Sequence, residues 1–181
     1  MRLDFHTHGK LAKKLPFSTA YTDWLFGEAR RAGLDALCLT EHFNTLQFAD
    51  VYGYIASVSR RTGDALELEN GLKIFPGMET DVAEGGHILS VGPLEAILEL
   101  NRQLEPYKEK GNFMPFAQLM DLFDQYPVVV GCGHPFRAGG HVPHRSPCRG
   151  KFSGRFPAPG CPPFCGSPRR CSHIRRRTGG C

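Results

Sequence analysis

The stretch LDALCLTEH, residues 34–42, decides the fold class of this chain. It begins as an apolar run of the length and composition that are typical of a buried strand. It ends in Thr40, Glu41 and His42, where polar side chains replace the apolar ones. We therefore interpret the stretch as a core strand that delivers polar groups at its carboxyl end.

Predicted strands and helices alternate on both sides of this stretch. The strands are expected at residues 1–8, 34–42, 72–82, 85–92 and 127–135. The helices are expected at residues 18–33, 48–63, 93–104 and 115–126. This alternation predicts an α/β fold with a mainly parallel sheet.

Polar side chains recur at the ends of the predicted strands. At carboxyl ends they are His6, His8, Glu41, His42, Glu79 and His134, and His87 stands at the start of another strand. Because the carboxyl ends of the strands converge in an α/β barrel, we expect these side chains to meet at one face.

The pair His6 and His8 is the first candidate metal site. Alternate residues of a strand point to the same side, so both imidazoles can reach one ion. Imidazole nitrogen suits Zn, Fe and related divalent metals. Asp4, two residues earlier, is expected either to bind the metal or to orient one histidine. The alternative is a chance H-x-H pattern on a surface strand.

Three carboxylates are further candidates. Glu79 directly follows an apolar strand, and a carboxylate can bridge two cations, which one imidazole nitrogen cannot. Asp81 is a weaker candidate, with an ordinary turn residue as the alternative. Glu41 is expected to be solvated or to orient a neighbouring ligand.

The remaining candidates have competing interpretations. His42 is either a ligand or a solvated loop residue, and His87 is either a ligand or a polar residue at a strand edge. His134 stands at the mouth of an apolar strand. Arg137, in the same loop, is expected to bind an anionic group such as phosphate, with an ordinary surface arginine as the alternative. The sequence contains no GxGxxG, Walker or G-x-S-x-G motif.

Taken in order, five motifs resemble those of the PHP (polymerase and histidinol phosphatase) family. They are DFHTHG, LCLTEHFNT, FPGMETDV, GGHILSVG and VVVGCGHPFR, and the resemblance covers residues 1 to about 140. It implies a distorted seven-stranded (β/α) barrel with two or three divalent metal ions (Zn, Mn or Fe) at its carboxyl face. It also implies hydrolysis of phosphate esters, with a small phosphorylated substrate or a nucleotide as the partner.

The resemblance also implies roles for the candidate residues. His6 and His8 would hold one metal, Glu79 would bridge it to a second, and His134 would join this cluster. The catalytic residues would be Glu79 and Arg137, with Arg137 holding the phosphate. A bridging water would attack phosphorus in line.

A third, outer metal would be held by His42 and His87. Many family members carry another ligand about five residues after the H-x-H pair, but this chain has Lys10, Lys13 and Lys14 in that region. We therefore expect one metal to be held less tightly. The lysines are expected to be solvated, or alternatively to attract an anionic substrate.

A second departure concerns the end of the barrel. The family carries an Asp-x-His motif on the last strand, and this chain has no aspartate after Asp124. We therefore expect a partial barrel without its closing strands, with exposed strand edges, weak folding and impaired catalysis.

Charge and cysteine content divide the chain near Gly140. Residues 141–181 hold nine Lys or Arg and no Asp or Glu, whereas residues 1–140 hold 13 basic and 18 acidic side chains. Cys38 and Cys132, each in an apolar run, predict reduced thiols in a cytoplasmic protein, and no apolar stretch is long enough to span a membrane. We expect a catalytic domain over residues 1–140 and a disordered basic tail over residues 141–181.

Three hypotheses compete for the tail. Its mixture of Arg, Pro, Gly and Cys is typical of GC-rich DNA read out of frame. A zinc module would use Cys161, Cys165, Cys171 and His173. A nucleic-acid-binding arm would use the basic run RRCSHIRRR, residues 169–177.

Two functions therefore compete for the whole chain. The first is a metal-dependent hydrolase of phosphate esters, histidinol-phosphatase-like and impaired by its missing motif. The alternative is a noncatalytic protein that binds metal or nucleic acid.

Overall fold

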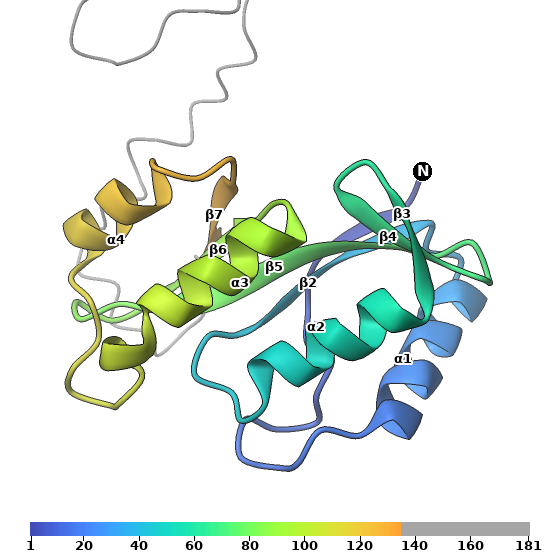
Figure 1. Ribbon diagram of the computed structural model, residues 1–181, viewed down its shortest axis with the longest axis horizontal. Coiled ribbons are helices and arrows are strands. Elements are labelled where there is room, and N and C mark those ends of the chain that lie inside the picture. Colours follow the sequence, from blue (N-terminus) through green and yellow to red (C-terminus); the bar gives the residue numbers. More distant parts are fainter. Residues whose placement is uncertain (135–181) are drawn as a thin grey trace, which may run out of the picture. The chain divides into compact units, whose positions relative to one another are not determined.

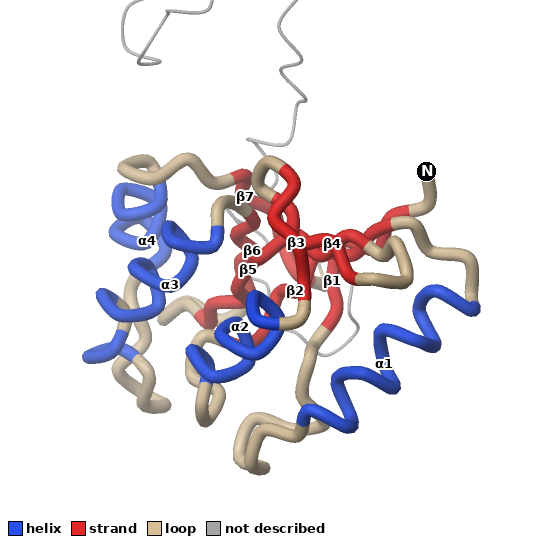
Figure 2. The backbone as a smooth tube through the Cα atoms, turned by 45° about the vertical axis from the view of Figure 1, so that its right-hand side comes forward, coloured by secondary structure: helices blue, strands red, loops and turns tan. Residues whose placement is uncertain are grey.

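The structure, a computed structural model, describes residues 1–134 as a seven-stranded sheet with four α-helices (Figures 1 and 2). The strands are β1 Leu3–Thr7, β2 Ala36–His42, β3 Ser59–Thr62, β4 Ala65–Leu68, β5 Lys73–Asp81, β6 His87–Val91 and β7 Val129–Gly133. The helices are α1 Thr19–Arg31, α2 Phe48–Ser57, α3 Leu94–Gln103 and α4 Phe116–Phe123, with a 3-10 turn η1 at Glu105–Tyr107. Arg137, the predicted boundary near Gly140 and the tail lie outside the described residues.

The sheet is mixed, so the predicted α/β class is confirmed but the mainly parallel sheet is wrong. Strand β2 pairs in parallel with β1 and β5, whereas the β3–β4, β4–β5, β5–β6 and β6–β7 pairs are antiparallel. The link between β5 and β6 is only residues 82–86, and Gly85 and Gly86 adopt φ values of 83° and 104°. Such a short link closes a hairpin and cannot hold a crossover helix.

The predicted helix over residues 48–63 is also wrong in its second half. Helix α2 ends at Ser57, and β3 and β4 form a hairpin in its place. Thr62 pairs with Ala65 across a two-residue loop in which Gly63 has a φ of 62°. The dipeptide Gly63-Asp64 is itself a hairpin signal, so the chain reverses where the helical pattern predicted one more turn.

Helices α2 and α3 pack against the middle of the sheet (Figure 1). The buried hydroxyl of Tyr52 in α2 donates to the carbonyl of Leu39 in β2 at 2.5 Å and also contacts the carbonyl of Gly77 in β5. From α3, Asn101 donates its Nδ2 to the carbonyl of Phe43 at 2.6 Å. These hydrogen bonds fix α2 and α3 against the strands whose ends carry the candidate residues.

The sheet does not close into a barrel within residues 1–134. Strand β1 pairs there only with β2, and β7 pairs only with β6. Phe5 in β1 and Val129 in β7 remain 67% and 77% exposed. The described strands thus form an open sheet, and the partial barrel stays a prediction. Over the same residues, every helix is too short or too polar to cross a membrane.

Candidate metal centre

Five strands bring the candidate ligands to one edge of the sheet. His6, His42 and Glu79 lie in the carboxyl halves of β1, β2 and β5, and His42 stands directly beside Glu79 in the register. Because β6 runs antiparallel to β5, its first residue, His87, falls at the same edge, opposite Asp81. Strand β7 is antiparallel to β6 and therefore ends at this same edge, directly before His134. His87, at the start of β6, thus lies close to the ligands at the ends of the other strands.

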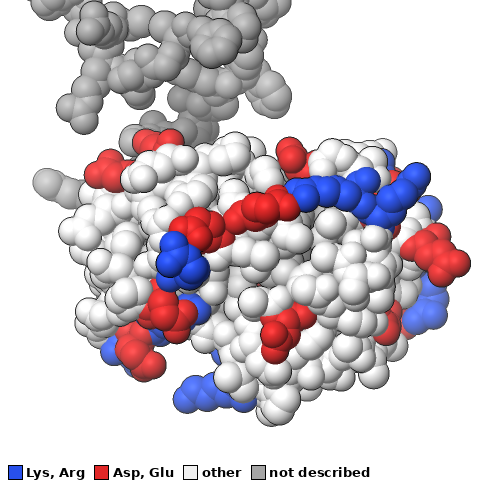
Figure 3. Space-filling view, viewed as in Figure 1, with Lys and Arg blue, Asp and Glu red and all other residues white. Residues whose placement is uncertain are grey.

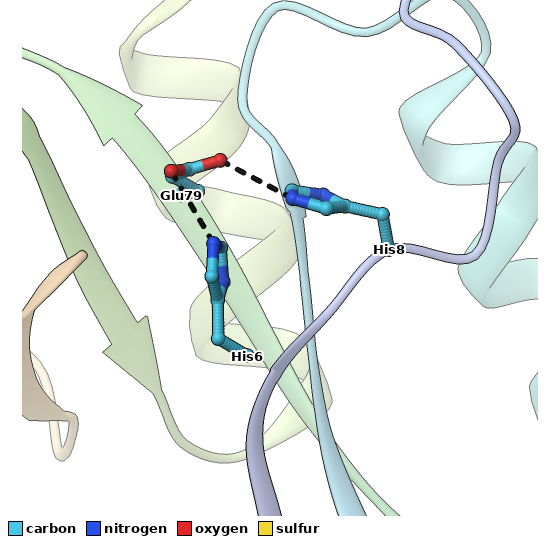
Figure 4. Close-up of side chains that lie close together, drawn as sticks. All are labelled: His6, His8 and Glu79. Atoms are coloured by element: carbon cyan, nitrogen blue, oxygen red, sulfur yellow. Dashed lines mark ion pairs between the residues drawn. The ribbon is translucent and has the colours of Figure 1, made fainter. Parts of the chain in front are cut away.

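Glu79 is the centre of the cluster. Its side chain is buried, and five histidines surround it at ion-pair distance: His6, His8, His42, His87 and His134. Figure 4 shows His6 and His8 pointing at its two carboxylate oxygens from β1 and the loop that follows. A carboxylate placed in this way can serve two cations at once.

The two oxygens of Glu79 face different histidines. Oε1 lies 3.5 Å from His6 Nε2 and 3.8 Å from His134 Nε2, and it also accepts a hydrogen bond from His87 Nδ1. Oε2 lies 3.5 Å from His8 Nε2 and 2.7 Å from His42 Nδ1.

Two overlapping sets of ligand atoms meet the spacing needed to hold a metal ion. One consists of His6, His8 and Glu79, and the other of Glu79, His87 and His134. Within each set the ligand atoms lie within 4.8 Å of one another. His42 lies close to both, with its ring 4.3 Å from that of His8 and 6.3 Å from that of His87.

Several buried polar atoms in the cluster fit a bound cation. His8 Nδ1, His42 Nδ1 and Glu79 Oε2 are buried without a hydrogen-bond partner among the described residues. The 2.7 Å approach of His42 Nδ1 to Glu79 Oε2 lacks the angles of a hydrogen bond. Leaving such atoms unsatisfied is costly, whereas a divalent ion accepts lone pairs from both imidazole and carboxylate. The donor set therefore fits divalent metals.

The electrostatic environment favours the metal-binding protonation states of His6, His8 and Glu79. Burial, reinforced by the neighbouring His42, lowers the pKa of His8 to about 4, and burial likewise lowers the pKa of His6. Burial alone would raise the pKa of Glu79, but the close approach of His42 and the hydrogen bond from His87 outweigh it and lower that pKa overall. The hydrogen bond to Glu79 raises the pKa of His87. Near neutral pH, His6 and His8 are uncharged and Glu79 is ionised, as metal binding requires.

One residue that supports the ligands, Thr40, was not predicted from the sequence. Buried Thr40 places its Oγ1 2.7 Å from His6 Nδ1, which fixes the orientation of that ring. Asp4, expected to bind metal or to orient one histidine, accepts the backbone N–H of His6 at 3.0 Å. Asp81, expected to be a weak candidate or a turn residue, ends β5 with its Oδ1 3.2 Å from His87 Nε2.

The carboxylate of Glu41 is buried, which excludes the solvated interpretation. It accepts the backbone N–H groups of Lys10 and His42, each at 3.1 Å, and lies 3.8 Å from His8 Nδ1. Burial raises its pKa. Glu41 thus ties the loop after β1, which begins with His8, to the end of β2.

The three lysines after the H-x-H pair have different environments, so the expectation of three solvated charges is wrong for Lys10. Its side chain is buried, and its Nζ donates to the carbonyls of Lys13 and Leu46. Lys13 is half-buried and places its Nζ 3.3 Å from Asp81 Oδ2. Lys14 alone is exposed.

No protein-family model and no curated protein matches the chain. Its fold is similar to that of PsfC from Pseudomonas syringae PB-5123, with a TM-score of 0.52 and 23% identity over 73% of this chain and 55% of PsfC. It is also similar to the lesion-specific endonuclease PfuEndoQ from Pyrococcus furiosus, with a TM-score of 0.57 and 16% identity over 73% of this chain and 34% of that protein.

A third similar structure is Endonuclease Q in complex with a 27-mer duplex substrate that has an abasic lesion at the active site. The TM-score is 0.56, and 17% identity extends over 75% of this chain and 35% of that one. The chain thus spans about a third to about half the length of the three proteins. At these identities the likeness shows a shared fold.

Proposed function

We propose that this chain is a metal-dependent hydrolase of phosphate esters, of the PHP type. The observation that carries the proposal is the buried Glu79 carboxylate. It belongs to both of the overlapping ligand sets, and its two oxygens face different histidines. The fold shared with two structures of endonuclease Q supports the same reaction class, because an endonuclease cleaves phosphodiester bonds.

In this proposal the ligands divide between two ions. His6 and His8 would hold one ion, His87 and His134 would hold the other, and Glu79 would bind both. Divalent ions held there would supply Lewis-acid polarisation of a phosphoryl oxygen and an acidified water. The protein's own contribution is to keep the imidazoles of His6 and His8 neutral and to fix the orientation of the ligands before a substrate arrives.

Other parts of the proposal rest on the PHP resemblance. These are Zn, Mn or Fe as the metals and phosphate binding by Arg137. The resemblance implies a third ion held by His42 and His87, whereas the present proposal groups His87 with Glu79 and His134. A nucleic-acid contact through the basic tail is likewise a proposal. On the face shown in Figure 3, acidic and basic side chains of the described residues are intermixed, with large uncharged areas between them.

A noncatalytic metal-binding protein is the second candidate. The observation that favours it is the ligand geometry itself, which is that of a metal site whether or not a substrate is turned over. Such a protein would bind metal through the same histidines without turning over a substrate.

The two candidates are separated by assaying the purified full chain, loaded with Mn, Zn or Fe, on p-nitrophenyl phosphate and bis-p-nitrophenyl phosphate. The hydrolase predicts metal-dependent release of p-nitrophenol, reduced by about 100-fold or more in His8→Ala. The exposed substitution Arg60→Ala in β3 is the control and should leave the rate unchanged. Bound metal without hydrolysis of either ester would favour the noncatalytic protein.

A further inference from the structure

Two candidate ligands near the metal centre, His42 and Asp81, belong to neither ligand set. Over residues 1–134, every group of ligand atoms with the spacing of a metal site is one of the two sets that share Glu79. The third ion that the PHP resemblance implies therefore has no complete set of ligand atoms in this part of the chain. The side chain that stands beside Asp81 is that of Lys13.

The carboxylate of Asp81 already faces a cation of the protein itself. Its Oδ2 accepts a hydrogen bond from Lys13 Nζ at 3.3 Å, and its Oδ1 lies 3.2 Å from His87 Nε2. Only 13% of the Asp81 side chain and 33% of the Lys13 side chain are exposed, so the pair is partly shielded from water. A carboxylate withdrawn from water needs either a charged partner or a metal ion, and Asp81 has the partner.

The backbone of Lys13 is fixed in position. Its carbonyl accepts from the backbone N–H of Leu46 at 2.9 Å, from Thr45 Oγ1 at 3.2 Å and from Lys10 Nζ at 3.3 Å. These bonds fasten the loop after β1 to the loop after β2. The Lys13 side chain therefore starts from a fixed point of the loop and reaches Asp81 at the end of β5.

The position of Lys13 in the sequence agrees with its position in the fold. It is the fifth residue after His8, in the region where many members of the resembling family carry another metal ligand. An ammonium group has three hydrogen-bond donors and no lone pair, so it cannot bind a metal ion. Its charge also repels a cation placed nearby. The loop thus supplies a positive charge where it could have supplied a ligand.

The two neighbouring lysines differ from Lys13 in their contacts. Lys10 Nζ donates to the carbonyls of Lys13 and Leu46, so it serves the loop itself. Lys14 is exposed. Lys14 therefore offers a control that carries the same charge one residue away.

We propose that the Lys13 ammonium takes the place of a third metal ion beside Asp81, so that the centre holds two divalent ions and one built-in positive charge. The inference rests on the metal centre of the proposed function, and it adds the number of ions and the residue that limits that number. The positive charge on this side of the centre then does not depend on the supply of metal.

Replacing the ammonium with a ligand tests the proposal. Lys13→Glu adds a carboxylate beside Asp81 and His87, so the zinc content of the full chain should rise from about two to about three ions. Lys13→His, which adds an imidazole without a negative charge, should give the same increase. Elemental analysis after loading and dialysis measures the zinc content, and circular dichroism shows that each variant is folded.

Three further variants locate the added ion. Lys14→Glu makes the same change of charge on the exposed neighbour and should stay at about two ions. Lys13→Met removes the charge without adding a ligand, so it should bind a third ion about tenfold or more weakly than Lys13→Glu does. Adding Asp81→Asn to Lys13→Glu should return the content to about two ions.

Several outcomes would overturn the inference. One is a wild-type chain that already holds three ions, and another is an unchanged zinc content in both folded variants, Lys13→Glu and Lys13→His. A third is an equal gain of zinc in Lys14→Glu. Failure of the hydrolase function would appear separately, as a wild-type chain that holds two ions and hydrolyses neither p-nitrophenyl ester. A wild-type chain that binds no ion would overturn both proposals.

Discussion

The two halves of β5 lie in one strand beside the same neighbour, β2, yet their buried side chains differ in kind. In the amino half, Ile74 is fully buried and pairs with Leu37 of β2 and Leu66 of β4. In the carboxyl half, Glu79 is 1% exposed and pairs with His42 of β2. Burying an aliphatic side chain stabilises a fold, whereas burying a carboxylate costs free energy unless it is paired. The first half is built for stability and the second for binding.

The largest expected effect on stability comes from the amino half. Ile74→Ala should lower the free energy of unfolding by about 2–5 kcal/mol, because it removes buried methyl groups and leaves a cavity. The metal content of the folded protein should stay the same. Urea unfolding measures the first quantity and elemental analysis the second.

The exposed Val129 supplies the control for this substitution. Val129→Ala should change stability by less than about 0.5 kcal/mol, because the side chain is already in water. If fully folded Ile74→Ala protein lost its metal, the division of β5 into a stabilising half and a metal-binding half would be contradicted.

A smaller effect is expected from a substitution beside the carboxyl half. Thr40→Val removes the hydroxyl that contacts His6 Nδ1 while keeping the shape of the side chain. The His6 ring then loses its fixed orientation, so metal affinity should decrease by about 10- to 100-fold. Competition with a chelator of known affinity measures the change.

Thr80 in β5 provides a matched control for Thr40. It is also buried, but its Oγ1 has no hydrogen-bond partner among the described residues. Thr80→Val should therefore leave metal affinity unchanged and should not destabilise the protein. Equal losses of affinity in the two variants would contradict a specific role for the Thr40 hydroxyl.

The smallest expected effect is a pH dependence of the metal-free protein. His8 has a pKa of about 4 when folded and about 6.5 when unfolded. As pH falls through this window the unfolded chain takes up the proton first, so the free energy of unfolding should decrease by about 1–2 kcal/mol between pH 6.5 and 4, after allowance for partial exposure.

Two other groups in the cluster titrate nearby. The lowered pKa of Glu79 removes stability as pH falls below about 4.5, and the raised pKa of His87 acts in the opposite direction, because its contribution is lost as pH rises above 6.5. Comparing wild type with His8→Gln by urea unfolding in the presence of a chelator isolates His8. A slope that His8→Gln leaves unchanged would exclude His8 as its source.

Sequence reasoning found the strands that end in ligands because apolar runs and polar ends are local signals. The stretch over residues 34–42 forms a buried strand with His42 at its end, and residue 79 falls beside it in the sheet. The hairpin at residues 59–68 was missed because the helical pattern of α2 was extended across the signal at Gly63.

The residues that support the ligands were harder to predict. Thr40 lies in an apolar strand, and only the pairing of β1 with β2 brings its hydroxyl to His6, 34 positions away. Lys10 reads as a surface charge, but the fold buries it against two carbonyls. Such contacts depend on which strands pair in the sheet. The spacing of residues along a single sequence does not reveal that pairing.

The most direct test of the central claim is the metal content of three forms of the full chain, measured by elemental analysis after dialysis. The two ligand sets share Glu79, so wild type should hold about two divalent ions and Glu79→Gln should lose both together. The control is Glu67→Gln, which changes a carboxylate of β4 that pairs with the amino half of β5, and it should lose none. Retention of both ions by Glu79→Gln, with the fold intact, would contradict the shared carboxylate at the centre of this account.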